Sequence, residues 1–168
     1  MLPRGAGGRG SARLADVYEI ETYQPRKGVG YLLSRVRTEM LLALDEALEA
    51  DEELAALEIS AAQFIVIATL ALADTPRSAS DLCKGISYDA GAMTRMIDRL
   101  ESKGLIRRNR RLDDRRVVYI ELTEEGNRAF PRMRAISMGV VNRFLRGFSQ
   151  AEARQLEGFL TRMLENAA

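Results

Sequence analysis

The chain has 168 residues, of which 46% are hydrophobic and 29% are charged, a composition typical of one globular domain. It contains no histidine and one cysteine, which excludes an internal disulfide, a zinc site and histidine acid–base catalysis. The longest apolar run, 64–73, is about half the length of a membrane span, and no secretory signal precedes it. We therefore predict a cytoplasmic protein that is not an enzyme and needs neither metal nor cofactor.

Residues 1–22 are rich in glycine and arginine, and we expect them to form a disordered basic tail. Three of the glycines, Gly5, Gly7 and Gly10, match the G-x-G-x-x-G pattern of dinucleotide-binding loops. No strand precedes them and no βαβ unit follows, so the pattern has the wrong context for a nucleotide site.

Two helices are predicted next in the chain. Apolar residues recur at helical spacing from Val29 to Leu48 and indicate one long helix within residues 23–58. Ser60 and Gln63 have the spacing of a capping box and indicate the start of a second helix. Because the run that follows is apolar on nearly every face, we expect the second helix to be buried.

A third, short helix is predicted to begin after Pro76, to be capped by Ser78 and Asp81, and to end near Gly85. It contains Cys83, the only cysteine of the chain. A helix N-terminus and an adjacent lysine favour the reactive thiolate, which makes oxidation of Cys83 a candidate switch. The alternative is a small buried residue with a packing role.

A helix and two strand-like runs are predicted between residues 89 and 123. The helix ends at Gly104, because glycine enters the left-handed conformation without steric cost. The runs Leu105–Arg111 and Val117–Leu122 predict a β-hairpin with its tip at Leu112–Arg116. Together they outline a winged helix-turn-helix over residues 59–123. The inner face of the helix is expected to carry Ala90, Met93, Ile97 and Leu100, and the outer face Thr94, Arg95, Asp98, Arg99 and Ser102.

Positive charge is concentrated in this region. Residues 95–116 contain nine Lys or Arg and four Asp or Glu, a local net charge of +5 in a chain whose total is +1. Residues 38–76 contain nine acids and no Lys or Arg. A basic segment on an acidic body indicates a nucleic-acid surface, although a charge run by itself is also typical of a solvated face.

Two further helices are predicted after the hairpin, one capped by Thr123 and running to about Arg146, the other capped by Ser149 and Glu152. The fold is thus mainly α with a small β-hairpin, in the order ααααββαα. Residues 23–58 and 124–168 carry more apolar surface than the winged region can cover. We therefore expect a homodimer in which these helices interleave, the alternative being a monomeric bundle.

The segment GAMTRMIDRLESKGLIRR, followed by DDRRVVYIELTEEG, resembles the recognition helix and wing of MarR-family transcriptional regulators. The most distinctive features are Asp-x-Arg at Asp114–Arg116 and the Leu-Thr-x-x-Gly pattern of Leu122, Thr123 and Gly126. The resemblance extends from about Tyr23 to Leu164. It implies sequence-specific binding of double-stranded DNA at a pseudo-palindromic operator by a homodimer, most often with repression.

The resemblance also implies roles for residues of the recognition helix. Thr94 and Arg95 match positions that reach base edges in the major groove, where arginine suits the acceptor pair of guanine. Gly91 and Ala92 have little bulk and allow a close approach to the groove floor. For Arg99 we expect a phosphate contact, the alternative being a surface ion pair with Asp98 or Glu101.

In the wing, Arg116 matches an arginine that enters the minor groove, with Asp114 orienting it and Arg115 as an alternative inserting residue. Basic residues alternate along the first strand, so about half are expected to face DNA, Arg110 among them. Ser78 and Ser87 lie near helix N-termini and are candidate phosphate donors, although capping alone would explain them.

Regulators of this kind usually release DNA when a small aromatic or phenolic anion binds between the dimer helices and the winged domain. Candidate pocket residues are Tyr31, Arg35, Gln63 and Phe64, although each is also an ordinary helix-face residue. An alternative from another class is a winged-helix protein–protein interaction module without specific DNA binding. That alternative predicts an apolar rather than a basic exposed face.

Overall fold

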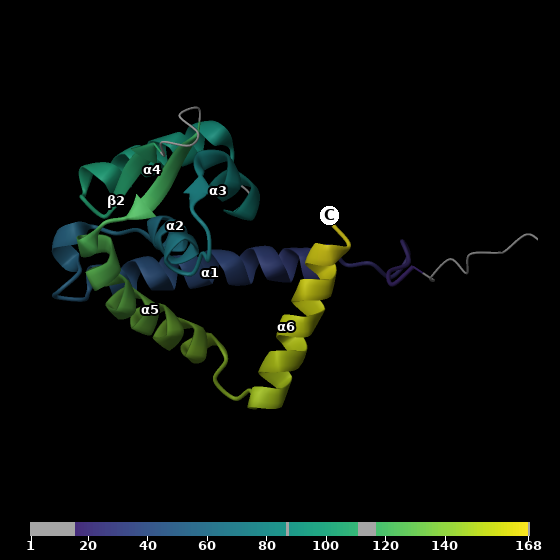
Figure 1. The fold of residues 1–168 in the computed structure, drawn as a ribbon. Coiled ribbons are helices and arrows are strands. Elements are labelled where there is room, and N and C mark those ends of the chain that lie inside the picture. Colours follow the sequence, from purple (N-terminus) through teal and green to yellow (C-terminus); the bar gives the residue numbers. More distant parts are fainter. Residues whose placement is uncertain (1–15, 87, 111–116, 168) are drawn as a thin grey trace, which may run out of the picture. The chain divides into compact units, whose positions relative to one another are not determined.

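The computed structural model describes residues 16–86, 88–110 and 117–167, which form six α-helices, one 3-10 helix and three strands (Figure 1). Two compact units, Met1–Val36 and Arg37–Ala168, make up the chain. None of the described helices is both long and apolar enough to cross a membrane. The elements are α1 Val29–Glu49, η1 Ala55–Leu57, α2 Ala61–Ala71, β1 Arg77–Ser78, α3 Ala79–Ile86, α4 Ala90–Ser102, β2 Ile106–Arg110, β3 Val118–Leu122, α5 Glu124–Phe144 and α6 Gln150–Glu165.

In the first unit, two tyrosines pack at the start of α1. The Tyr18 hydroxyl accepts a hydrogen bond from the backbone N–H of Val29 at 3.2 Å, so it satisfies an N–H group at the start of the helix. The Tyr18 and Tyr23 rings meet edge to face, with centroids 5.0 Å apart. Gly28 is buried against Tyr23, whose ring atom Cε2 would lie 2.8 Å from a Cβ at that position. These contacts order the chain immediately before α1.

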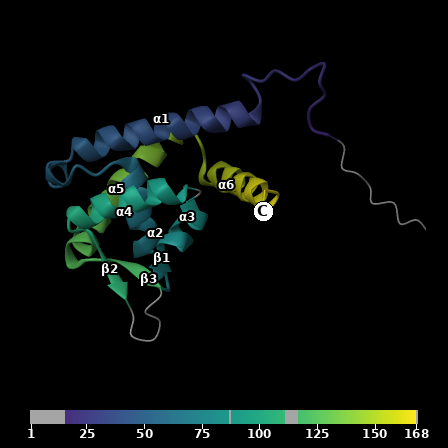
Figure 2. The same cartoon turned by 90° about the horizontal axis from the view of Figure 1, so that it is seen from above.

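The second unit contains the hydrophobic core. Helices α2, α3 and α4 pack together beside the sheet, and α5 packs on α2 (Figure 2). As expected, α2 is largely buried, although Leu72 just beyond its end is 67% exposed. The largest fully buried side chains are Leu48, Val66, Ile67, Leu82, Met93, Ile97, Leu100, Leu105, Ile106 and Met133. They come from every α-helix except α6 and from the start of β2, so one core holds the winged region together.

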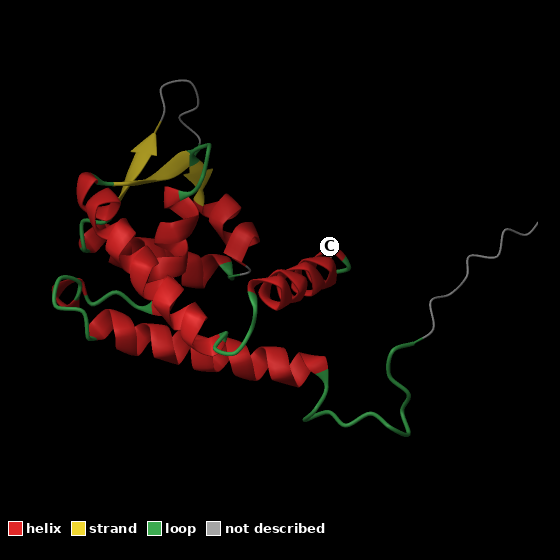
Figure 3. Cartoon of the chain, turned by 90° about the horizontal axis from the view of Figure 1, so that it is seen from below, coloured by secondary structure: helices red, strands yellow, loops and turns green. Residues whose placement is uncertain are grey.

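The sheet has three antiparallel strands in the order β1-β3-β2 (Figure 3). The β2–β3 hairpin confirms the predicted wing, with Arg108 opposite Ile120 in the register. The third strand, β1, was not predicted. The predicted start of the third helix is confirmed, since α3 begins at Ala79 and the capping bonds between Ser78 and Asp81 are present. A two-residue strand is too short to show alternation, and its pairing with β3 is a long-range contact.

Local signals at the helix ends are confirmed. Ser60 and Gln63 form the predicted capping box of α2, and Ser149 and Glu152 form that of α6. Thr123 caps α5 by accepting a hydrogen bond from the N–H of Gly126 at 3.1 Å. These side chains satisfy N–H groups that have no partner inside the helix, which is why they mark helix starts in sequence.

The wing spans residues 105–122. Hydrogen bonds from Thr123 hold together its base, the point where the two strands join the rest of the protein. Its N–H donates to the carbonyl of Leu105 at 3.0 Å, and its hydroxyl donates to the carbonyl of Gly104 at 2.6 Å. The chain therefore enters and leaves the wing at the same point.

Candidate nucleic-acid interface

Helix α4 is held by one face and both ends. The Asp89 carboxylate caps its start by accepting a hydrogen bond from the N–H of Ala92 at 2.8 Å. Met93, Ile97 and Leu100 are at most 1% exposed and anchor the helix in the core. Beyond its end, Gly104 has a φ of 70°, the left-handed conformation that the sequence predicted.

The outer face of α4 is exposed as predicted, and it carries Thr94, Arg95, Asp98, Arg99 and Ser102. Ala90, expected on the inner face, is also exposed because it stands in the first turn, beyond the edge of the core. The hydroxyl proton of Thr94 is donated to the carbonyl of Ala90 at 2.8 Å. The Thr94 oxygen keeps a lone pair, so it is available to accept a hydrogen bond from outside the helix.

Arg95 and Arg99 line one groove of about 220 Å³ between α4 and the start of α2. Ala92 and Met96 form part of its wall, and none of the described residues that line it is an Asp or Glu. A Cβ at Gly91 would lie 3.2 Å from Oδ1 of Asp89 and 3.4 Å from Nη1 of Arg95, so an added side chain would touch both the helix cap and this guanidinium. The two arginines therefore present positive charge side by side along the helix.

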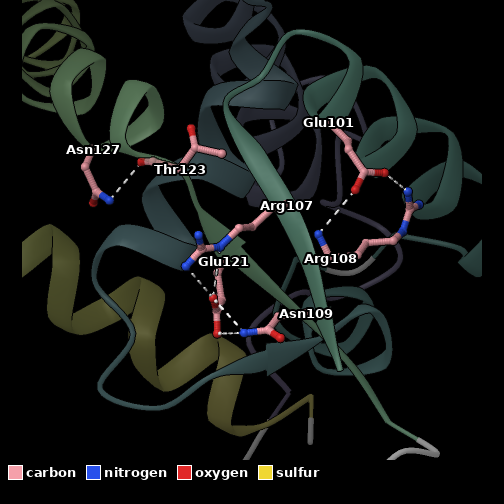
Figure 4. Close-up of polar contacts among 7 residues, drawn as sticks. All are labelled: Glu101, Arg107, Arg108, Asn109, Glu121, Thr123 and Asn127. Carbon is pink, nitrogen blue, oxygen red and sulfur yellow. Dashed lines mark hydrogen bonds and ion pairs between the residues drawn. The ribbon is translucent and has the colours of Figure 1, made fainter. Parts of the chain in front are cut away.

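The ion pair considered for Arg99 is not found among the described residues, because both candidate acids bind Arg108 of β2. Nη1 of Arg108 pairs with Oε2 of Glu101, as Figure 4 shows. Nη2 of Arg108 lies 2.5 Å from Oδ1 of Asp98. The backbone N–H of Arg108 also donates to Oε1 of Glu101 at 3.2 Å. The hydrogen bond to Asp98 raises the pKa of the Arg108 guanidinium. Arg99 therefore does not share these two acids, and its side chain lines the groove.

The opposite face of β2 is organised around Glu121 of β3. Arg107 lies directly across from Glu121 in the register and binds its carboxylate at 3.2 Å. The amide of Asn109 donates to the same carboxylate at 3.2 and 3.3 Å (Figure 4). Two of the alternating strand arginines, Arg107 and Arg108, are thus paired with acids inside the protein. Arg110, the last residue of β2, is exposed.

The remaining candidate DNA contacts fall into two groups. Arg111, Asp114, Arg115, Arg116 and Ser87 lie outside the described residues. Ser78 is described: it accepts a hydrogen bond from the N–H of Asp81 at 3.2 Å and donates its hydroxyl to that carboxylate at 2.7 Å. The backbone N–H of Ser78 also donates to this carboxylate at 2.9 Å, and this bond, together with the one from the hydroxyl, lowers the pKa of Asp81. Ser78 is thus engaged in capping.

The candidate pocket residues have local partners. Nη1 of Arg35 donates to the Tyr31 hydroxyl at 3.3 Å, and the hydrogen bonds from Arg35 and Arg26 lower the pKa of Tyr31. In the other unit, Gln63 is buried with its side chain in the α2 capping box, and Phe64 is 9% exposed in the core.

Cys83 is half-buried in α3, has a free thiol and packs against the core. Contact with the core is what the packing alternative expected, although Cys83 is not fully buried. Oxidation at this position would place a polar group against apolar neighbours.

Sequence reasoning did not identify two tethers of α4. One is the Arg108 bridge, whose only sequence signal is the i,i+3 spacing of Asp98 and Glu101 on the same helix face. The other is Lys103, whose ammonium donates to the carbonyls of Leu57 and Glu58, both at 2.6 Å. Its partners are backbone atoms 46 and 45 residues earlier in the chain, so no side-chain pattern marks them.

Comparison with known families gives one matching model, that of the MarR family, over residues 59–118. The match covers the region from the start of α2 to the second wing strand. An HTH-type transcriptional regulator of Bacillus subtilis, YdgJ, is 34% identical over 89 residues. The aligned part is 53% of this chain and 54% of that protein, so it spans about half the length of this relative.

Solved structures share the fold over most of the chain. Apo MarR of E. coli has a TM-score of 0.66 and 28% identity, and the match covers 82% of this chain and 97% of MarR. A variant of E. coli MarR complexed with operator DNA has a TM-score of 0.68 and 29% identity, with 80% and 92% covered. The similarity therefore includes the helices on both sides of the winged region.

Proposed function

Since the chain belongs to the MarR family of winged helix-turn-helix transcriptional regulators, we propose that it binds duplex DNA in a sequence-specific way through α4 and the wing. The observation that carries the proposal is the exposed pair Arg95 and Arg99, which share one groove on a helix anchored by its opposite face. A rigid helix with a basic outer face is what entry into the major groove requires. A comparable protein, the E. coli MarR variant, was solved with operator DNA.

Within α4, we assign sequence reading to Thr94 and Arg95 and phosphate contact to Arg99. Arg95 stands in the first half of the helix, beside Gly91, where small residues allow close approach to base edges. Arginine forms two hydrogen bonds with guanine, a contact worth about 1–3 kcal/mol of discrimination. Arg99 lies one turn further on, where a helix that enters the groove by its N-terminal part meets the backbone.

For the wing, we propose that Arg116 inserts into the minor groove, with Asp114 orienting it and Arg115 as the alternative. Arg110 is the described basic residue nearest to this tip in the sequence, and its exposed side chain would contact a phosphate. Arg107 and Arg108 are paired with acids and are not included among the DNA contacts.

We propose that the active form is a homodimer. In the described part of the chain, α6 buries none of its residues, although Phe159, Met163 and Leu164 are 47%, 39% and 74% exposed. On α1, Leu32 and Val36 are 50% and 47% exposed. Apolar surface of this extent on terminal helices favours a two-fold partner. A two-fold dimer would place its recognition helices about 34–36 Å apart, one turn of DNA.

We propose repression of transcription, with release by a small aromatic or phenolic anion or by oxidation of Cys83. Either signal acts only if it favours one dimer geometry over the other. The two are separated by titrating preformed DNA complexes with hydroxybenzoates and, separately, with hydrogen peroxide. If peroxide releases the wild type and the Cys83→Ser variant alike, Cys83 is not the sensor.

The alternative, an interaction module, finds less support in the exposed face of α4. That face carries three charged side chains, Arg95, Asp98 and Arg99, where a protein partner would require apolar contact area.

The experiment that tests the proposed function is selection of bound sequences from random duplex DNA at two salt concentrations. We expect a pseudo-palindrome whose half-sites are about 10 base pairs apart, because a two-fold protein reads matching half-sites one turn apart. Weak, unselective binding that disappears at moderate salt would leave only the phosphate contribution and would contradict the proposal. Arg128→Ala is a suitable control, since Arg128 pairs with Glu125 on α5, away from the groove.

A further inference from the structure

Asp98 is an acid on the face of α4 that we assign to DNA, and Glu101 is a half-buried acid beside that face. Acids at a DNA surface repel phosphates, so their presence there requires a second role. Asp98 lies one turn after Thr94 and Arg95, and Glu101 lies one turn after Asp98. Both side chains turn to one residue of the wing, Arg108.

The bridge has three bonds, and Glu101 supplies two of them. Its Oε1 accepts the backbone N–H of Arg108 at 3.2 Å, while Oε2 pairs with Nη1 of the guanidinium (Figure 4). Asp98 binds the other terminal nitrogen of the guanidinium: its Oδ1 lies 2.5 Å from Nη2 of Arg108. A guanidinium held at both arms, with its own backbone held by the same partner, has little freedom to rotate.

The exposure of the bridge indicates what it contributes. The side chains of Arg108, Asp98 and Glu101 are 34%, 56% and 38% exposed, and ion pairs so open to water add little to folding stability. The bridge joins two elements that must meet DNA together: α4 in the major groove and the wing beside it. Its effect is therefore on the orientation of the wing relative to the helix.

We propose that Arg108, Asp98 and Glu101 form a clamp that sets the position of the wing against the recognition helix, so that helix and wing engage one DNA site simultaneously. The inference rests on the proposed function, because it assumes that both elements contact DNA. Arg108 is in this view a positioning residue, and its charge is directed to acids of the protein rather than to phosphates.

Removal of the two acids should change the affinity for DNA, and the clamp and simple electrostatics predict opposite directions for this change at the selected site. The double variant Asp98→Asn, Glu101→Gln takes two negative charges from the DNA-facing surface. Electrostatics alone predicts tighter binding to every DNA. The clamp predicts binding to the selected site that is weaker by about tenfold, while binding to random DNA is unchanged or tighter.

The experiment measures affinity for the selected site and for random duplex DNA across a series of salt concentrations. Arg108→Ala should weaken site binding to a similar degree, leave the salt slope close to that of the wild type, and add little in the background of the double acid variant. Were Arg108 a phosphate contact instead, its removal would lower the salt slope by about 0.9 and weaken all sequences equally. Glu125→Gln is the matched control, since it breaks an exposed ion pair with Arg128 that does not involve the wing.

Amide hydrogen exchange of the free protein tests the clamp without DNA. We expect faster exchange at the N–H of Arg108 in Glu101→Ala, which removes the oxygen that accepts this N–H, and unchanged exchange in Glu125→Gln. Unchanged exchange at Arg108, or tighter binding of the selected site by the double variant, would overturn the clamp. A wild type that selects no sequence would instead contradict the proposed function, and the clamp would then be judged by exchange alone.

Discussion

A Cβ placed on Gly126 would lie 2.2 Å from the carbonyl oxygen of Leu105. Gly126 stands in the first turn of α5, three residues after its cap, and Leu105 is where the chain enters the wing. The same Leu105 carbonyl accepts the N–H of Thr123 at 3.0 Å. Glycine in the Leu-Thr-x-x-Gly pattern is therefore required by close approach of two backbones.

We expect Gly126→Ala to destabilise the fold by about 1–3 kcal/mol or more, because the methyl group meets backbone that cannot move without opening the base of the wing. Urea unfolding followed by circular dichroism measures this. Gly85→Ala is the control: nothing lies within 4 Å of a Cβ there. It should change stability by at most about 1 kcal/mol, in the stabilising direction expected for alanine in a helix. Equal effects of the two substitutions would refute the steric explanation.

The bond between Asp51 and Arg132 should contribute to acid sensitivity. Oδ2 of Asp51 accepts from Nε and Nη2 of Arg132, each at 2.8 Å, and this partner lowers the pKa of Asp51 from its ordinary 3.8. The folded chain keeps the carboxylate ionised to lower pH than the unfolded chain. The stabilisation is therefore present above the ordinary pKa and is lost as pH falls from about 5 downward.

Asp51→Asn should accordingly flatten the dependence of unfolding free energy on pH in the acid range, while reducing stability at neutral pH. Urea midpoints at a series of pH values from neutral to acid give the slope. Glu46→Gln, which alters an exposed acid of α1, should leave the slope of the wild type nearly intact. If the unfolding free energy of Asp51→Asn and of the wild type depended on pH with the same slope, this pair would not contribute to acid sensitivity.

Removal of Arg95 and removal of Arg99 should have different effects on DNA binding. Arg95→Ala should cost about 1–3 kcal/mol at one base position and relax the preference there, because a bidentate base contact is lost. Arg99→Ala should weaken binding to all sequences and reduce the salt slope by about 0.9, the signature of one phosphate contact. Repeating the selection and the salt series with each variant distinguishes them. Loss of preference in Arg99→Ala but not in Arg95→Ala would reverse our assignment.

The exposed apolar side chains of α6 should be needed for association. Phe159→Asp places a charge on a face we expect to be buried between subunits, at a cost of about 2 kcal/mol or more to dimer formation. Sedimentation velocity at several concentrations measures the change. Leu72→Asp is the control, because Leu72 is 67% exposed but lies outside the terminal helices. If the Phe159→Asp variant remained dimeric, Phe159 would not lie in the interface, and α1 and α5 would be the next helices to test.

Local signals allowed the main elements to be predicted from sequence. The capping pairs Ser60–Gln63 and Ser149–Glu152 mark the starts of α2 and α6, and each lies within four residues, so its partners are visible together. Gly104 marks the end of α4 for the same reason. The outer face of α4 followed from its helical period, and the candidate residues Arg95 and Arg99 were found on it.

Long-range contacts explain what sequence analysis missed. The strand β1 exists only through its pairing with β3, more than forty residues later. The acids Asp98 and Glu101 look available to Arg99 in sequence, yet in the fold Arg108 reaches them from β2. In each case folding brings the interacting residue close from a distant part of the sequence. Composition and periodicity do not indicate such a contact.

The closed base of the wing has a consequence for how such a protein changes over time. Strands β2 and β3 are paired from Ile106 with Leu122 to Arg110 with Val118, and Thr123 fastens the point where they join the body. Residues inserted between Arg110 and Val118 would lengthen a connection whose two ends are already fixed by the strand pairing. For a flexible segment, doubling the length costs roughly 0.6 kcal/mol in closure entropy. The reach of the wing can therefore vary among descendants of this chain while the helices beneath it stay the same.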